Sequence, residues 1–246
     1  KFNLKYIVAK LLSIRGVDKD YIENFLDPNI NNDIPNPAKL KDIEKATSRV
    51  IQAIEKKERI GIIADYDVDG STSASILFKF LKNFTSSIIL KIPNRLVDGY
   101  GPNIKLMREM LDKKVDLLLT LDCGTTSNEI IDNKEFKNID VIVIDHHLSE
   151  IKLPNVLAII NPNRVDDTSD YTQLAAVGVT FLFLMYLRKK LREFNKFDEI
   201  KEPNLLSYLD LVALGTVCDV VELKRYNRFF VQKGLELIHK RYHKGI

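Results

Sequence analysis

Short runs of aliphatic residues alternate with longer amphipathic stretches through most of the chain. Each run is too short for a helix, so these runs predict strands covered on both faces of a parallel sheet, at residues 60–64, 88–92, 115–121, 140–144 and 156–160. Apolar residues at helical spacing in the intervening stretches predict helices, among them 38–57, 70–84 and 174–194. This alternation predicts an α/β fold with a parallel sheet and flanking helices.

The two ends of the chain depart from this repeating pattern. Residues 1–37 combine a short helical pattern at Tyr6–Leu12 with a polar, proline-containing stretch, and they predict an arm or small subdomain. Residues 38–225 hold the alternating elements of the main domain, and residues 226–246 predict the start of a connecting helix. Where the helix after Gly70 begins, Ser71 or Thr72 is the expected cap.

Acids and histidines follow three of the predicted strands, at Asp65, Asp67, Asp69, Asp122, Asp145, His146 and His147. The carboxyl ends of parallel strands share one rim of a sheet, so these side chains can converge on one site. If the extended conformation persists beyond residue 64, the first three aspartates project to one side. A hard divalent cation such as Mg²⁺ or Mn²⁺ relieves their repulsion. For this triad alone, a solvated acidic loop is the alternative.

The donor types point to a class of reaction. Carboxylates with one or two imidazoles and no cysteine cluster fit a two-metal site that hydrolyses a phosphate ester. In such a site one carboxylate bridges the ions, and water between them becomes the nucleophile. Hard ions disfavour thiolate ligands, so Cys123 and Cys218 are expected to be small packing residues.

The composition is that of an ordinary globular protein and excludes few functions. The 246 residues carry a net charge of +3, which permits a nucleic-acid partner without requiring one. Two cysteines without a disulfide framework suit a reducing, cytoplasmic environment. The most apolar window, Leu174–Leu187, is too short to span a bilayer, so no membrane segment is expected. The chain begins at Lys1 without a signal-peptide pattern, which suggests a fragment or a processed chain.

The chain carries four motifs in this order: Asp65–Gly70, Leu121–Thr125, Asp145–His147 and Gly215–Val221. Together they resemble the motifs of the DHH phosphoesterase superfamily. Within that superfamily they are most similar to the RecJ family of single-strand-specific 5′–3′ DNA exonucleases. Further segments are similar to RecJ segments, namely Ile92–Arg95, Asp98–Gly101, Asn161–Asn163 and Ala176–Val179. The resemblance covers roughly residues 38–240 and implies a Rossmann-like DHH domain. Many relatives carry histidine near Ile63 and glycine at Ala64, and this chain has neither.

The resemblance implies a metal centre. Two ions, Mn²⁺ or Mg²⁺, are expected at ligand positions matched by Asp67, Asp69, Asp122, His146 and Asp219. Of these, Asp122 is the expected bridge between the ions and also a catalytic residue. Asp65 is expected to be an additional acid, which either binds a metal ion directly or supports a residue that does.

The resemblance also implies roles around the metals. His147 matches the position that contacts the scissile phosphate and assists departure of the leaving group. Arg95 and Tyr100 match positions that hold the DNA strand or its 5′ end. Asp145 is expected to orient the two histidines without itself binding a metal ion.

The implied function is single-strand-specific exonuclease activity that releases 5′-mononucleotides in DNA repair and recombination. Single-stranded DNA is the expected partner, with single-strand-binding protein and a helicase as implied protein partners. RecJ-like proteins carry a second domain and often an OB fold, and neither is recognisable in this sequence. One alternative is a DHH phosphodiesterase that acts on short oligonucleotides or cyclic dinucleotides. Another is an inactive replication scaffold. The loop Arg95–Tyr100 favours the exonuclease, and the intact acids argue against a scaffold.

Overall fold

A five-stranded parallel sheet lies at the centre of the fold, in the order β2-β1-β3-β4-β5. The computed structural model describes residues 4–28, 34–198, 200–241 and 243. The strands are β1 (Ile60–Ala64), β2 (Ile88–Lys91), β3 (Leu117–Leu121), β4 (Asp140–Ile144) and β5 (Ala158–Ile160). The predicted parallel α/β fold is therefore confirmed. Two strands, β3 and β5, begin two residues later than predicted.

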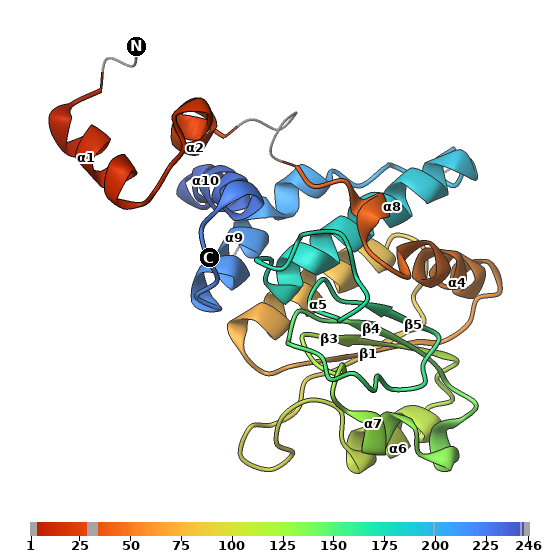
Figure 1. The fold of residues 1–246 in the computed structure, drawn as a ribbon. Helices are drawn as coiled ribbons and strands as arrows, with labels where there is room; N and C mark the ends of the chain where they lie inside the picture. Colours follow the sequence, from red (N-terminus) through yellow and green to blue (C-terminus); the bar gives the residue numbers. More distant parts are fainter. Residues whose placement is uncertain (1–3, 29–33, 199, 242, 244–246) are drawn as a thin grey trace.

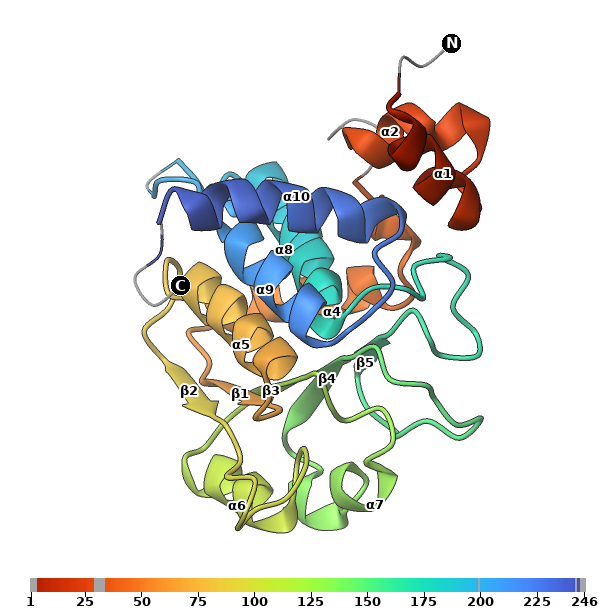
Figure 2. The same ribbon diagram turned by 90° about the vertical axis from the view of Figure 1, so that its left-hand side faces the viewer.

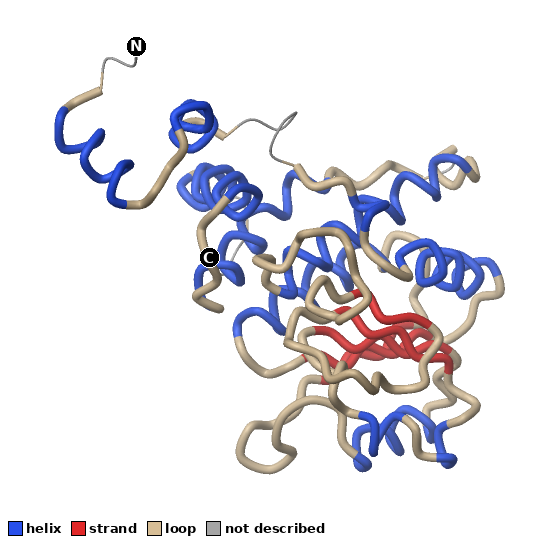
Figure 3. The backbone as a smooth tube through the Cα atoms, viewed as in Figure 1, coloured by secondary structure: helices blue, strands red, loops and turns tan. Residues whose placement is uncertain are grey.

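Helices cover both faces of the sheet (Figure 1). One face carries α4 (Ile43–Glu55), α5 (Val68–Leu81), α8 (Ala176–Glu193), α9 (Leu209–Cys218) and α10 (Arg225–His239). The other face carries α6 (Ile104–Asp112), α7 (Asn128–Ile131) and the 3-10 turn η3 (Lys134–Phe136). The strands are therefore enclosed at the centre of the chain trace (Figure 3).

Alternate residues of each central strand enter two separate cores. Ile62 belongs to the larger core beneath α4, α5 and α8, whereas the next residue, Ile63, belongs to the smaller core beneath α6. All five residues of β1 and all five of β3 are buried. Burial on both faces is why these segments read as unbroken apolar runs.

The chain turns from β1 into α5 within three residues. The helix begins at Val68, and its cap is Asp67, whose side chain accepts a hydrogen bond from the Gly70 amide at 2.9 Å. The predicted cap at Ser71 or Thr72 is wrong because both residues already lie inside the helix. Gly70 permits the tight turn, since a Cβ atom there would lie 2.4 Å from the Asp65 carbonyl oxygen.

The amino-terminal arm contacts the rest of the fold at α10. It contains α1 (Tyr6–Ile14), the 3-10 turn η1 (Lys19–Tyr21) and α2 (Ile22–Leu26). The Arg228 guanidinium lies over the Phe25 ring, 3.6 Å from its centroid, and Arg228 Nε donates to the Phe25 carbonyl at 2.8 Å. Because η1 and α2 lie within the expected polar stretch, part of that stretch is helical. Its asparagines Asn29, Asn31 and Asn32 lie outside the described residues.

Two further 3-10 turns, η2 (Pro37–Lys39) and η4 (Leu205–Tyr208), precede α4 and α9. The last helix, α10, lies across α9 (Figure 2), and its Phe230 ring meets the Phe181 ring of α8 edge to face at 5.5 Å. Gly234 allows this close approach, because a Cβ atom there would lie 2.2 Å from the Leu209 carbonyl oxygen. Within the described part of the chain, no helix combines the length and the apolar character needed to cross a bilayer.

Candidate metal centre

Four strands end at the same level, and the next residue of each enters one site. The pairing register places Ala64 opposite Leu121, Leu121 opposite Ile144, and Ile144 opposite Ile160. The ladder continues for one more hydrogen bond per pair, from the amides of residues 65, 122 and 145 to the carbonyls of residues 121, 144 and 160, at 3.0 to 3.1 Å. The residues that follow the strands are therefore neighbours: Asp65, Asp122, Asp145 and Asn161.

Three carboxylates form a first group, in which oxygens of Asp65, Asp67 and Asp122 lie within 4.8 Å of one another. Asp65 and Asp122 are buried, whereas Asp67 is exposed. Burial, with the neighbouring aspartates, raises the pKa of Asp122 to about 10, and burial raises the pKa of Asp65. In the absence of a cation, the fold therefore disfavours the negative charge that this group would carry at neutral pH.

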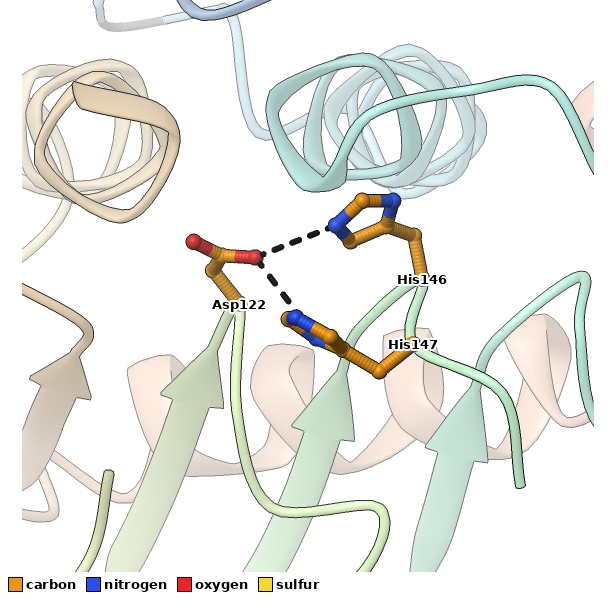
Figure 4. Close-up of side chains that lie close together, drawn as sticks. All are labelled: Asp122, His146 and His147. Atoms are coloured by element: carbon orange, nitrogen blue, oxygen red, sulfur yellow. Dashed lines mark ion pairs between the residues drawn. The ribbon is translucent and has the colours of Figure 1, made fainter. Parts of the chain in front are cut away.

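A second group adjoins the first and contains Asp69, His146 and Asp219. His146 Nε2 lies 3.8 Å from Asp69 Oδ2 and 3.6 Å from Asp219 Oδ2. It also lies 3.4 Å from Asp122 Oδ1, so Asp122 faces both groups. Figure 4 shows Asp122 on one side and the rings of His146 and His147 turned toward it. Burial raises the pKa of Asp69 to about 7.

The side chain of Asp69 does not point the same way as those of Asp65 and Asp67, because α5 begins at Val68 and Asp69 is therefore helical. The expectation that all three acids project to one side of an extended segment is therefore wrong. Asp69 instead accepts hydrogen bonds from the Ala176 amide at 2.6 Å and the Val177 amide at 2.8 Å. These are free amides at the start of α8, whose own cap residue, Ala175, offers no side-chain acceptor. This contact has no local signal in the sequence, because Asp69 and Ala176 are 107 residues apart.

Asp145 accepts hydrogen bonds from the segment that carries His146 and His147. Its Oδ1 accepts hydrogen bonds from His147 Nδ1 at 2.8 Å and from the amides of His146 and His147 at 2.8 and 3.2 Å. Its Oδ2 accepts one from the Thr125 amide at 3.1 Å. Burial raises the pKa of Asp145, but the hydrogen bonds from His147 and Thr125 outweigh it and lower the pKa to about 2. Asp145 thus contacts the ring of His147 but only the backbone of His146.

Asn161 and Asn163, for which the sequence predicted no role in the site, complete this support. Asn161 is fully buried, and its Nδ2 donates to the Thr125 hydroxyl and to the His147 carbonyl, both at 2.9 Å. The Nδ2 of Asn163 donates to the His146 carbonyl. The sequence shows the segment Asn161–Asn163 directly after the fifth predicted strand, but it does not indicate which carbonyls these side chains bind.

The loop after β2 places one candidate residue inside the site and the other at its rim. The Tyr100 hydroxyl donates to the Asp122 carbonyl at 2.8 Å and lies 3.3 Å from each ring nitrogen of His147. Arg95 is exposed, and its guanidinium lies over the ring of Tyr66, 5.5 Å from the centroid.

The donor set fits a hard divalent cation. Among the described residues, three buried atoms that face this region have no hydrogen-bond partner: Asp65 Oδ1, Asp122 Oδ1 and His146 Nε2. Carboxylate oxygens are the ligands that manganese and magnesium prefer, and imidazole nitrogen is a common ligand of divalent transition metals. Cys123 is buried and donates its thiol to the Leu121 carbonyl, as expected of a packing residue. Cys218 is exposed, so the same expectation is wrong for it.

Known RecJ proteins are similar to this chain in sequence. The single-stranded-DNA-specific exonuclease RecJ of Haemophilus influenzae is 38% identical over 208 residues, which are 84% of this chain and 36% of that protein. RecJ of Escherichia coli is 39% identical over 81% of this chain and 35% of its own length. The chain therefore spans about a third of the length of these curated relatives.

Solved structures agree with the sequence comparison. A crystal structure of exonuclease RecJ bound to manganese has a TM-score of 0.69 and 33% identity, covering 80% of this chain and 48% of that one. RecJ of Thermus thermophilus in complex with Mn²⁺ has a TM-score of 0.71 and 29% identity, covering 92% of this chain and 30% of that one. A sequence model described as the DHH family, N-terminal domain, matches residues 59–216. Because this match spans more than half of the chain, including most of the residues that converge at the strand ends, the chain belongs to the DHH family.

Proposed function

We propose that this chain is the metal-dependent catalytic part of a single-strand-specific 5′–3′ DNA exonuclease. The position of Asp122 supports the proposal best, because its buried Oδ1, which has no hydrogen-bond partner, faces both ligand groups. Similarity to named single-stranded-DNA-specific exonucleases supports the substrate, and the 5′–3′ direction is what the resemblance of the motifs implies. In this proposal residues 1–37 are an arm, residues 38–225 the DHH domain, and the helix from residue 226 a connection. The setting is DNA repair and recombination, with single-strand-binding protein and a helicase as protein partners.

Two ions, Mn²⁺ or Mg²⁺, would be held by the two adjoining groups. Asp65 and Asp67 would hold one ion; Asp69, His146 and Asp219 the other; and Asp122 both. Asp69 would use oxygen lone pairs that the α8 amides leave free, since the Ala176 amide bonds one of its oxygens and the Val177 amide the other. When bound, such a pair of ions activates water and neutralises charge on the phosphate.

His147 would supply the proton that the leaving group needs. Release of a 5′-mononucleotide breaks the bond between phosphorus and the 3′ oxygen, which leaves with a proton, while hydroxide from water adds to phosphorus. The hydrogen bond with Asp145 raises the pKa of His147, which favours the protonated ring. Asp145 keeps its own charge and fixes the orientation of the ring through Nδ1, so the ring can act as a general acid.

The test uses the full-length natural protein, 5′-phosphorylated single strands, matched duplexes and a calorimetric titration with Mn²⁺. We expect binding of two ions per chain, stepwise release of 5′-mononucleotides from the 5′ end of single strands, and loss of hydrolysis on chelation. Hydrolysis of dinucleotides or cyclic dinucleotides without attack on long strands would favour the phosphodiesterase alternative. A folded protein that neither binds Mn²⁺ nor cleaves any of these substrates would favour the scaffold.

We predict that Arg95→Ala weakens the engagement of DNA without weakening Mn²⁺ binding. The exposed guanidinium at the rim can bind a strand phosphate in bidentate fashion, and it makes no described contact with the aspartates. At low salt KM for single strands should rise about tenfold, corresponding to about 1.4 kcal/mol, and the defect should shrink as salt rises.

Two variants sharpen this test. Arg95→Lys keeps the charge but loses the fork geometry, so it should recover only part of the affinity. Arg108→Ala is the matched control, because Arg108 is also exposed but pairs with Glu135 on the α6 face. Wild-type KM for Arg95→Ala across the salt series would assign the loop a structural role instead.

A further inference from the structure

We propose that Tyr100 is a positioning residue, whose hydroxyl fixes Asp122 and His147 relative to each other. This deepens the proposed function and rests on it. It also differs from the role that the family resemblance implies for Tyr100, which is to hold the DNA strand. The two roles depend on different parts of the side chain, the hydroxyl and the ring face, and can therefore be separated.

The backbone of Asp122 needs external support. Its φ is +59°, in the left-handed region, which glycine adopts more readily than residues with a side chain. The Asp122 amide is held by the Ile144 carbonyl at 3.0 Å, as the last bond of the sheet ladder. The Asp122 carbonyl is turned out of the ladder and accepts the Tyr100 hydroxyl at 2.8 Å. The direction of the Asp122 side chain follows from this backbone, so the tyrosine bond helps to aim the carboxylate.

The same hydroxyl limits the movement of His147. Its oxygen lies 3.3 Å from both ring nitrogens, and the two rings meet edge to face with centroids 5.8 Å apart. On its other side the imidazole is bound by Asp145 at 2.8 Å. The ring is therefore held between Asp145 and Tyr100, with Asp122 Oδ1 3.9 Å from its Nδ1. One hydroxyl thus joins the residue proposed to bridge the ions to the residue proposed to protonate the leaving group.

The loop is shaped to present Tyr100 in this way. Gly99 and Gly101, on either side of it, have φ values of +77° and +68°, which other residues rarely adopt. A Cβ atom on Gly101 would lie 3.2 Å from the Cβ of Cys123, so the loop packs directly against the residue after Asp122. The ring of Tyr66 meets Tyr100 edge to face at 6.5 Å. Tyr100 is thus in contact with Asp122, His147 and Tyr66 while the residue as a whole remains half exposed.

The discriminating variant is Tyr100→Phe in the full-length protein, because it keeps the ring and removes the hydroxyl. A positioning role predicts that kcat on 5′-phosphorylated single strands falls about tenfold with KM within about twofold, since small displacements of reacting groups carry large rate penalties. It also predicts a several-fold weaker affinity for Mn²⁺ by calorimetry, a readout that does not require turnover. A role in holding the strand predicts wild-type values for Tyr100→Phe and a raised KM for Tyr100→Ala.

The matched control is Tyr186→Phe, which removes the hydroxyl of a tyrosine that contacts Glu44 between α8 and α4. This control should keep wild-type kcat and Mn²⁺ affinity. If Tyr100→Phe also kept both, the proposal would be overturned, whatever its melting temperature. If the wild type bound Mn²⁺ but did not cleave single strands, the proposed function would fail. The Mn²⁺ affinity of Tyr100→Phe would still decide whether Tyr100 positions Asp122.

Discussion

Replacing Asp122 with asparagine should lower the hydrolysis of single-stranded DNA about a thousandfold, or about 4 kcal/mol in the barrier. The change keeps the shape of the side chain but removes the charge that faces both ligand groups, so neither group could neutralise its ion as before. Mn²⁺ titration should show fewer than two ions bound per chain at concentrations that saturate the wild type. Unchanged stoichiometry and rate would remove the bridging role. Asp112→Asn, an exposed aspartate at the end of α6, is the control.

The same variant should change how stability depends on pH when metal is absent. The pKa of Asp122 is raised from 3.8 to about 10 in the folded protein. Its contribution to stability is therefore fully present below about pH 4 and is lost as the pH rises toward 10. Removing the carboxyl should make the unfolding free energy of the metal-free protein fall less steeply between pH 5 and pH 9, as measured by urea denaturation. Added Mn²⁺ should stabilise the wild type more than the variant at pH 9, because the ion takes the place of the proton.

Replacing Asp145 with alanine should lower the free energy of unfolding by about 2–3 kcal/mol, as expected when backbone amides around a buried carboxylate lose their acceptor. The change leaves the amides of Thr125, His146 and His147 without their acceptor and frees the His147 ring. Because the pKa of Asp145 is lowered to about 2, its contribution is present above about pH 4 and is lost as the pH falls toward 2. The part of the deficit that comes from the carboxylate should therefore shrink below pH 4. The part that comes from protonated His147, whose pKa is raised by Asp145, should shrink as the pH rises above about 6.5.

Urea denaturation of the metal-free protein at several pH values measures this deficit. Asp145→Asn is the informative companion, because it keeps one oxygen acceptor and should cost less than the alanine variant. A deficit below about 1 kcal/mol for Asp145→Ala would mean that water or other groups satisfy the backbone amides. Asp132→Asn is a suitable control, since it alters a carboxylate that accepts one amide bond at the surface.

Much of the site followed from the order of residues along the chain. Aliphatic runs covered on both faces predict parallel strands, and parallel strands bring their carboxyl ends to one rim. An acid directly after a strand, such as Asp65, Asp122 or Asp145, therefore had a predictable place before any side-chain contact was known. The equal register of β1, β3, β4 and β5 is the structural reason that this prediction held.

Other parts of the site depend on contacts between distant segments. Asp69 binds the start of α8, and Asn161 binds the carbonyl of His147. Neither pairing has a local signature, because a hydrogen bond between distant segments depends on how the chain packs. The direction of the Asp69 side chain also depends on the start of α5 at Val68. Because a helix and an extended segment point this side chain in different directions, an error of one or two residues in the predicted boundary misplaces it.

The sequence by itself determined the fold class, the rim at which the chemistry lies and the ligand types, because periodicity and strand-end position are local properties. Only the tertiary structure decided which acids share a group, which backbone amides they bind, and that Tyr100 reaches the Asp122 carbonyl. Tyr100 and Asp122 are 22 residues apart, and their contact requires the left-handed turn at Asp122 and the glycine-flanked loop to meet. Such a meeting is set by packing and cannot be read from either segment alone.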